Sequence, residues 1–219
     1  MRRLLALIAI ASSALGLVVA TGTAGAAVRR DHPPTQITVI RPVNAAGFAR
    51  PSFTVVGVTG SVDCSFADPS PGAVSPNIEN CSPTAAGAFA CWKAAAAHKV
   101  LCLRNVRARK LTRIHRMGAF APTGLAPVLQ RAPLAVALAN GDYCTLRTGG
   151  TGAIRQGHPR WVETYFCNSG KFLWQRPATN HYGINEQFDA WIAVEAGASG
   201  PIFARYVLRA WFVGTYHGG

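Results

Sequence analysis

The stretch Trp161-Val-Glu-Thr-Tyr-Phe-Cys167-Asn-Ser-Gly170-Lys-Phe-Leu-Trp-Gln175 decides the fold class. Residues 161–167 and 171–175 are rich in aromatic and β-branched side chains, the types that strands favour. Asn168, Ser169 and Gly170 separate the two runs, and Asn and Gly tolerate the backbone angles that tight turns require. The stretch therefore predicts a β-hairpin.

Runs of the same kind occur along most of the chain, with turn residues between them. Residues 89–92 and 100–103 indicate a second hairpin, residues 133–139 a short helix or strand, and residues 68–83 and 118–133 connections rich in Pro, Ser, Asn or Gly. We expect a mainly β fold, an antiparallel sandwich or barrel-like sheets with few short helices and disulfide staples. Further strands are expected within residues 53–66, 143–148, 191–195 and 206–215.

The beginning of the chain has the three parts of a secretory signal peptide. Arg2 and Arg3 supply the positive charge, residues 4–20 are mostly apolar, and Ala24-Gly25-Ala26 fits the small-residue cleavage pattern. An uncleaved membrane anchor is the alternative, because 17 residues approach the roughly 20 needed to span a bilayer. We expect a signal peptide over residues 1–26, an extended arm over 27–52 with a short strand within 36–40, and one β-rich domain over 53–219.

All six cysteines follow the signal segment, and an even number in an exported chain predicts three disulfides. Fifteen pairings are possible, and short loops cost the least entropy to close. The spacings are not C-x-x-C and no His lies beside a cysteine pair, so no metal site is expected. The favoured pairs are Cys64 with Cys81, Cys91 with Cys102, and Cys144 with Cys167.

A basic run is the feature that departs most from an average sequence. It spans residues 104–116 without one acid, in a chain whose formal net charge is +13, or about +11 once Arg2 and Arg3 leave with the signal. If the run is a strand, Arg107, Arg109, Arg113 and His115 share one face. The alternative is a solvated strand face that protects a sheet edge. The predicted anion-binding residues are Arg104, Arg107, Arg109, Lys110, Arg113 and Arg116.

No motif indicates catalysis or a cofactor. Residues 147–152, Arg-Thr-Gly-Gly-Thr-Gly, superficially resemble a phosphate loop, but Gly157 and Pro159 follow where such a loop needs a helix. No nucleophile turn of the G-x-S-x-G type is present. The histidines show no metal-ligand spacing and are expected to be isolated on the surface. A Glu163–Glu186 carboxylate pair is only weakly indicated. The other residues considered for a metal or acid–base site are His158, His181, His217 and Asp189.

Several segments together resemble a group of uncharacterised secreted proteins of mycobacteria and related actinobacteria. They are residues 81–92 (CSPTAAGAFACW), 100–104 (VLCLR), 141–150 (GDYCTLRTGG) and 210–215 (AWFVGT). The resemblance covers most of residues 60–215 and implies secretion and a β-rich fold, but no activity. That group often has a less charged, Trp-containing stretch after the Leu-Arg, so a partner inferred from the basic run is particular to this chain.

These features predict a secreted or cell-envelope-associated, non-enzymatic protein that binds anionic envelope polymers or lipid headgroups. Nucleic acid is not an expected partner of an exported protein, and no cofactor is expected. One alternative is a small extracellular hydrolase with an acidic pair. The other is a secreted protease inhibitor presenting the loop between Cys81 and Cys91, although the cysteine spacing does not match the actinobacterial subtilisin inhibitors.

Overall fold

A computed structural model describes residues 32–83, 87–147, 149, 152–176 and 181–216, and the predicted signal peptide lies outside this part of the chain. The fold is all-β, as the sequence predicts, and consists of two small β-barrels. Within the described residues, two single 3₁₀ turns lie between strands, η2 (Val128–Gln130) and η3 (His181–Gly183). In the described part of the chain, no helix has the length and apolarity needed to cross a membrane.

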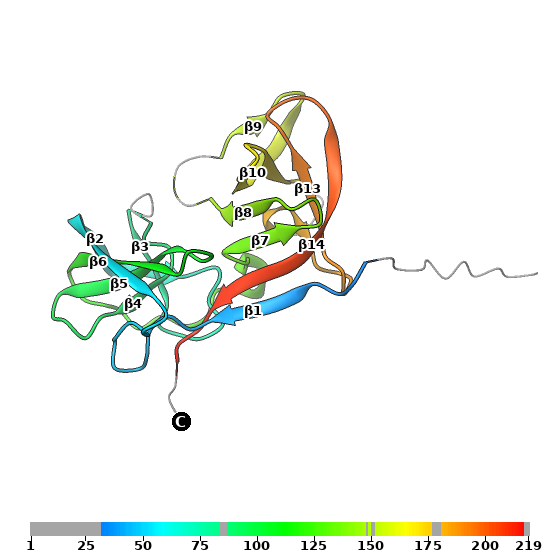
Figure 1. Cartoon of the computed structure of the whole chain (residues 1–219). Helices are drawn as coiled ribbons and strands as arrows, with labels where there is room; N and C mark the ends of the chain where they lie inside the picture. Colours follow the sequence, from blue (N-terminus) through cyan, green and yellow to red (C-terminus); the bar gives the residue numbers. More distant parts are fainter. Residues whose placement is uncertain (1–31, 84–86, 148, 150–151, 177–180, 217–219) are drawn as a thin grey trace, which may run out of the picture. The chain divides into compact units, whose positions relative to one another are not determined.

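The first barrel closes because its longest strand pairs with two partners. β2 pairs with β3 on one side and, in parallel, with β6 on the other, which completes the ring β2-β3-β4-β5-β6. The remaining pairings in this ring are antiparallel. The strands are β2 (Thr54–Pro69), β3 (Glu79–Ser82), β4 (Cys91–Lys93), β5 (Lys99–Asn105) and β6 (Lys110–Met117) (Figure 1).

Two disulfides make up much of the core of the first barrel. Cys64–Cys81 and Cys91–Cys102 are fully buried and pack with Val62, Val100 and Ile114. β5 is buried on both faces, since its alternate residues 101 and 103 pack into the larger cluster shared with the second barrel. This explains the unbroken apolar run at residues 100–103, in which strand alternation is hidden.

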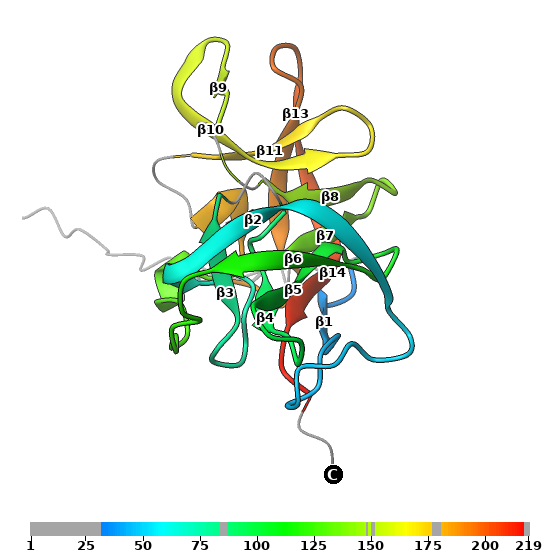
Figure 2. The same ribbon diagram turned by 90° about the vertical axis from the view of Figure 1, so that its left-hand side faces the viewer.

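The second barrel is built around β14, which pairs with both β7 and β13 and so closes the ring β7-β8-β10-β11-β13-β14. The short strands β9 and β12 pair with members of this ring, and β1 pairs in parallel with β14. The strands are β1 (Gln36–Ile40), β7 (Ala135–Leu138), β8 (Tyr143–Leu146), β9 (Ile154–Arg155), β10 (His158–Cys167), β11 (Phe172–Gln175), β12 (Ile184–Asn185), β13 (Ile192–Ala196) and β14 (Ile202–Val213) (Figures 1 and 2).

The hairpin that decides the fold class forms as predicted, with β10 and β11 joined by residues 168–171. Gly170 adopts a φ of 78°, which a residue with a side chain adopts only under strain. Cys167 lies directly opposite Cys144 on β8, and the two form the third disulfide. The six cysteines therefore pair as the short-loop argument favours.

Three segments that the sequence leaves open or predicts as a loop take a definite form in the structure. The short strand expected at residues 36–40 forms as β1 and pairs in parallel with β14, so this part of the 27–52 arm belongs to the second sheet. The loop expected over residues 68–83 contains β3, whose polar sequence Glu-Asn-Cys-Ser becomes a strand through barrel closure and its disulfide. Of the helix or strand expected for residues 133–139, the strand forms, at residues 135–138 between β14 and β8, because tertiary pairing overrides the helical preference of alanine.

Candidate functional site

The basic run occupies the β5–β6 hairpin of the first barrel. β5 ends at Asn105, residues 106–109 form a tight turn, and β6 begins at Lys110. The side-chain oxygen of Asn105 accepts a 2.7 Å hydrogen bond from the backbone N–H of Ala108, which fixes the turn. The strand expected to present four basic residues on one face is therefore interrupted: Arg107 and Arg109 lie in the turn, and only Arg113 and His115 lie on β6.

Arg116 differs from the other five predicted anion-binding residues. It is half-buried, its Nη1 donates to the carbonyl oxygen of Gly118, and its charge acts on Glu79. This side chain is engaged with the barrel rather than presented to solvent. The hairpin exposes the remaining five, which are Arg104, Arg107, Arg109, Lys110 and Arg113.

Negative charge is scarce along the chain near this hairpin and on the exposed surface for two reasons, although Asp63 on β2 lies opposite Met117 at the end of β6. First, no Asp or Glu occurs between Glu79 and Asp142 in the sequence. Second, four acids are buried: Glu79, Asp142, Glu163 and Glu195. Burial of acids leaves the exposed surface more basic than the formal charge suggests. Between Glu79 and Asp142 the chain carries only cations, namely Lys93, Lys99, Arg104, Arg107, Arg109, Lys110, Arg113, Arg116 and Arg131.

A polar pocket of about 290 Å³ adjoins the start of the basic run. Arg104 and Asn105 line it from the first barrel and Thr145 from the second, with Phe89 and Leu134 among its apolar walls. An arginine that lines a partly apolar pocket can bind a carboxylate or phosphate group bidentately through its guanidinium. Close to this segment of the second barrel, the Arg107 guanidinium lies 5.8 Å from the centre of the Tyr143 ring.

The backbone of Arg109 gives a prediction for the turn. Its φ is 50°, a left-handed conformation that costs a residue with a side chain about 1 kcal/mol. Because its side chain is exposed, we expect Arg109→Gly to raise the free energy of unfolding by about 0.5–1 kcal/mol, measured by urea denaturation. The matched change Arg113→Gly, in an exposed strand position, should lower it. A loss of stability in Arg109→Gly contradicts the prediction.

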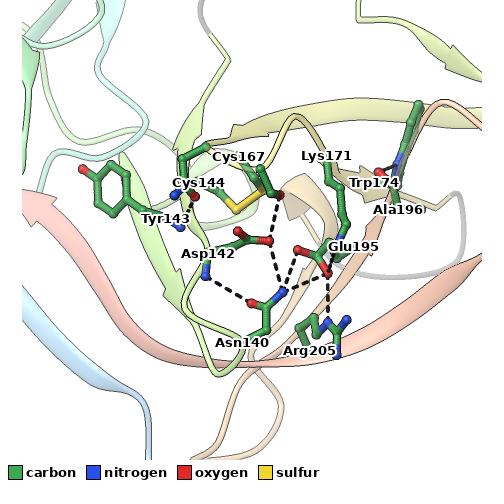
Figure 3. A network of polar contacts seen from close by, with 12 residues as sticks. Asn140, Asp142, Tyr143, Cys144, Cys167, Lys171, Trp174, Glu195, Ala196 and Arg205 are labelled. Carbon is green, nitrogen blue, oxygen red and sulfur yellow. Dashed lines mark hydrogen bonds and ion pairs between the residues drawn. A yellow bond between two sulfur atoms is a disulfide. The ribbon is translucent and has the colours of Figure 1, made fainter.

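A second cluster of charged groups lies in the second barrel, where the turns after β7 and β10 meet β13 and β14 (Figure 3). Glu195 on β13 is fully buried, and its Oε2 accepts from Arg205 at 2.9 Å and Lys171 at 3.4 Å. The amide Nδ2 of Asn140 lies 3.1 Å from Glu195 Oε1 and 3.1 Å from Asp142 Oδ2. One amide therefore bridges two carboxyl groups.

The same contacts show what the two carboxyl groups can do chemically. A hydrogen bond with the Glu195 side chain lowers the pKa of Asp142, burial opposes this, and hydrogen bonds from Ser169 (2.8 Å) and Asn140 lower it further. A general acid requires the opposite, a raised pKa. Most oxygens of the pair also have donors already, so the cluster ties strands together rather than offering free acid or base groups.

The acid pair considered from the sequence is not brought together in this way. Glu163 makes a 3.0 Å ion pair with Arg147, within the segment that superficially resembles a phosphate loop. Glu186 instead lines a largely apolar groove of about 550 Å³ with Trp191 and Phe212, and burial raises the pKa of its carboxyl. The two acids have different partners and different surroundings.

The remaining candidates are placed as follows. The ring of His158 packs on Trp161 at 4.3 Å between centroids, whereas His217 and the side chain of His181 lie outside the described part of the chain. The short strand β9, not a helix, follows residues 147–152. The loop considered for protease inhibition is fixed at both ends by disulfides, and its residues 84–86 lie outside the described residues.

Neither a scan against protein-family models nor searches of curated proteins and of solved structures find a match to this chain. Function therefore has to follow from the charge distribution and geometry of the chain itself. The resemblance to secreted actinobacterial proteins remains a prediction.

The sequence did not single out Asn140, Asp142 and Glu195, or the buried Glu79. Asn140, Asp142 and Glu195 have no shared spacing, since they come from a turn and from a strand more than 50 residues later. The Asn140-Gly141-Asp142 turn is the one local signal, because Asn and Asp side chains often bond neighbouring backbone groups. Asn140 Oδ1 does accept from the backbone N–H of Asp142 at 3.2 Å.

Proposed function

We propose that this chain is exported and binds anionic polymers or lipid headgroups of the cell envelope through the β5–β6 hairpin, without catalysing a reaction. The observation that carries the proposal is the charge separation between surface and interior. Five basic side chains are exposed on one hairpin, within a stretch that contains no acid, while half of the described acids are buried. Such a surface attracts polyanions.

The compartment is supported by the cysteines. All six form disulfides, and three disulfides are consistent with an oxidising location outside the cytosol. The signal-like sequence of residues 1–26 gives the route. In that compartment the available polyanions are surface polymers and anionic headgroups rather than nucleic acid.

The test is binding to two probes, vesicles containing phosphatidylglycerol and a soluble anionic polysaccharide, at low and high salt. Near an anionic surface each Lys or Arg contributes about 1 kcal/mol, so removing two should weaken binding by about 30-fold. We expect this loss for the double variant Arg109→Asn/Arg113→Gln and a strong weakening of wild-type binding between about 50 mM and 500 mM salt, because exposed charges are screened.

The matched control removes the same charge elsewhere. Arg41 and Arg160 are both exposed and lie outside the hairpin, so Arg41→Gln/Arg160→Gln should weaken binding far less. Equal losses in the two variants would show that net charge, not the hairpin, binds the probe. Binding that is insensitive to salt would refute the electrostatic proposal, and the two probes distinguish headgroups from polymers.

A further inference from the structure

Glu79 is a buried carboxyl group with no donor. It lies on β3, is fully buried, and faces the interior of the first barrel opposite Cys91. Among the described residues its Oε1 has no hydrogen-bond partner. Its Oε2 lies 4.0 Å from Sγ of Cys81, but a disulfide sulfur carries no hydrogen to donate. The carboxyl group therefore receives no hydrogen bond that would stabilise a negative charge.

The surroundings favour the protonated form of this group. Burial raises the pKa of Glu79 to about 8, against the opposing charge of Arg116 on β6. Near neutral pH, Glu79 is thus a carboxylic acid with a proton that it can give away. Sγ of Cys64, Sγ of Cys81 and a carboxyl oxygen of Glu79 all lie within 4.8 Å of one another.

We propose that Glu79 is the proton donor and acceptor for thiol–disulfide exchange at Cys64–Cys81. This goes beyond the binding function of the hairpin and assigns a redox-active role to one of the three disulfides. The co-reactant is an external thiol, of a small molecule or of another protein.

The exchange balances as follows. The external thiolate attacks Sγ of Cys64, a sulfur–sulfur bond forms between them, and the Cys64–Cys81 bond breaks. The electron pair of the broken bond stays on Sγ of Cys81, which takes the proton of Glu79 and becomes a thiol. The negative charge of the attacking thiolate ends on the Glu79 carboxylate. In the reverse direction this carboxylate removes the Cys81 proton, and the resulting thiolate closes the disulfide.

Access to the buried disulfide comes from the weakly held strand that carries Glu79 and Cys81. β3 pairs with β4 at one position, Glu79 with Cys91, and with β2 at three positions interrupted by an irregularity between Asp63 and Asp68. Backbone hydrogen bonds from Cys81 to Ala88 and from Ser70 to Ile78 also hold this segment, so the opening that the exchange requires is a local separation of β3 from β2 and β4. Opening of β3 uncovers the Cys64–Cys81 bond, so that a thiolate reaches Sγ of Cys64 on β2 while Glu79 stays two residues from Cys81 on β3.

The test follows the three disulfides separately in the oxidised, folded chain. Dithiothreitol is added, samples are quenched by alkylation, and the reduced cysteines are counted by peptide mass spectrometry. The Cys91–Cys102 rate serves as the internal reference, because it reports general opening of the same barrel. General acid catalysis contributes about 100-fold or more to a reaction rate, and water can replace part of it. At pH 7 we therefore expect Glu79→Gln to lower the ratio of the Cys64–Cys81 reduction rate to the Cys91–Cys102 reduction rate by at least about tenfold. Glu163→Gln, which changes a buried acid of the second barrel, should leave the ratio unchanged.

The pH dependence of the wild type separates proton donation from a merely structural role. If Glu79 donates the proton, the rate ratio falls as pH rises through about 8, because the donor is lost. If Glu79 only destabilises β3, its ionisation increases opening and the ratio rises instead. An unchanged ratio in Glu79→Gln, or a ratio that is flat or rises with pH in the wild type, overturns the proposal. These results do not depend on whether the hairpin binds polyanions.

Discussion

Glu79→Gln is expected to stabilise the folded chain by about 2 kcal/mol at pH 7. The pKa of Glu79 is about 8 in the folded barrel, because burial disfavours its charge, and near 4.5 when unfolded. Between these values the unfolded chain loses its proton while the folded chain keeps it, so stability falls by about 1.4 kcal/mol per pH unit. The amide of Glu79→Gln does not ionise, so the variant does not lose stability as the pH rises. Its N–H groups have no acceptor in the barrel interior, and burying them cancels part of this gain in the free energy of unfolding.

The sign of this effect sets the pH window. A raised folded pKa means that the full stability is present below about pH 4.5 and is lost as pH rises towards 8. The difference in free energy of unfolding between Glu79→Gln and wild type should therefore grow by about 3 kcal/mol from pH 5 to pH 8. Urea denaturation at several pH values, with all disulfides intact, measures it. The contributions of the other titrating groups cancel in this difference, because both proteins contain them. A difference that is constant with pH would contradict the burial argument.

Features carried by adjacent residues were predictable from the sequence. The 161–175 hairpin combines strand formers with a Gly-containing turn, so local preference and tertiary pairing agree. The disulfide pairs join cysteines that are close along the chain, and the geometry of neighbouring strands permits those pairs. The sequence also predicts the strand at residues 36–40, although its parallel pairing with β14 depends on a segment about 170 residues away.

Features that depend on distant partners could not be predicted. β3 has a loop-like sequence and forms because β2 and β4 flank it, and β2 and β6 close the barrel in parallel although local patterns favour antiparallel neighbours. In the basic run, the alternation of basic residues gave no sign of the turn that the Asn105 side chain fixes. Parity along a strand predicts a shared face only where the strand continues.

The distribution of charge joins the fold to the proposed function. A chain with few acids that buries half of those described exposes more cations than anions on its surface. The buried acids fall into two kinds. Glu163 and Glu195 pair with Arg and Lys side chains and Asp142 accepts from Asn140 and Ser169, whereas Glu79 has no donor. The first kind stabilises the second barrel and the second kind leaves a titratable, reactive group inside the first.

Glu195→Gln is expected to destabilise the chain by about 3 kcal/mol. Glu195 is fully buried and accepts from Arg205, Lys171 and Asn140, which come from β14, β11's preceding turn and the β7–β8 turn. The amide introduced by the substitution carries no charge to compensate Arg205 and Lys171, and its N–H groups face the N–H groups of those side chains. Breaking a buried ion pair from one side costs about 3–5 kcal/mol, and the partial exposure of both cations to water places the expectation at the lower end.

Glu163→Gln is the matched control for this measurement, because Glu163 is also buried but has a single ion-pair partner, Arg147, which is partly exposed. We expect it to lower the free energy of unfolding by about 1 kcal/mol or less. Urea denaturation of both variants at pH 7 gives the comparison. Equal losses would mean that the network around Glu195 adds nothing beyond one ion pair. A larger loss in Glu195→Gln shows that Asn140, Lys171 and Arg205 act through one carboxylate to hold three connections of the second barrel together.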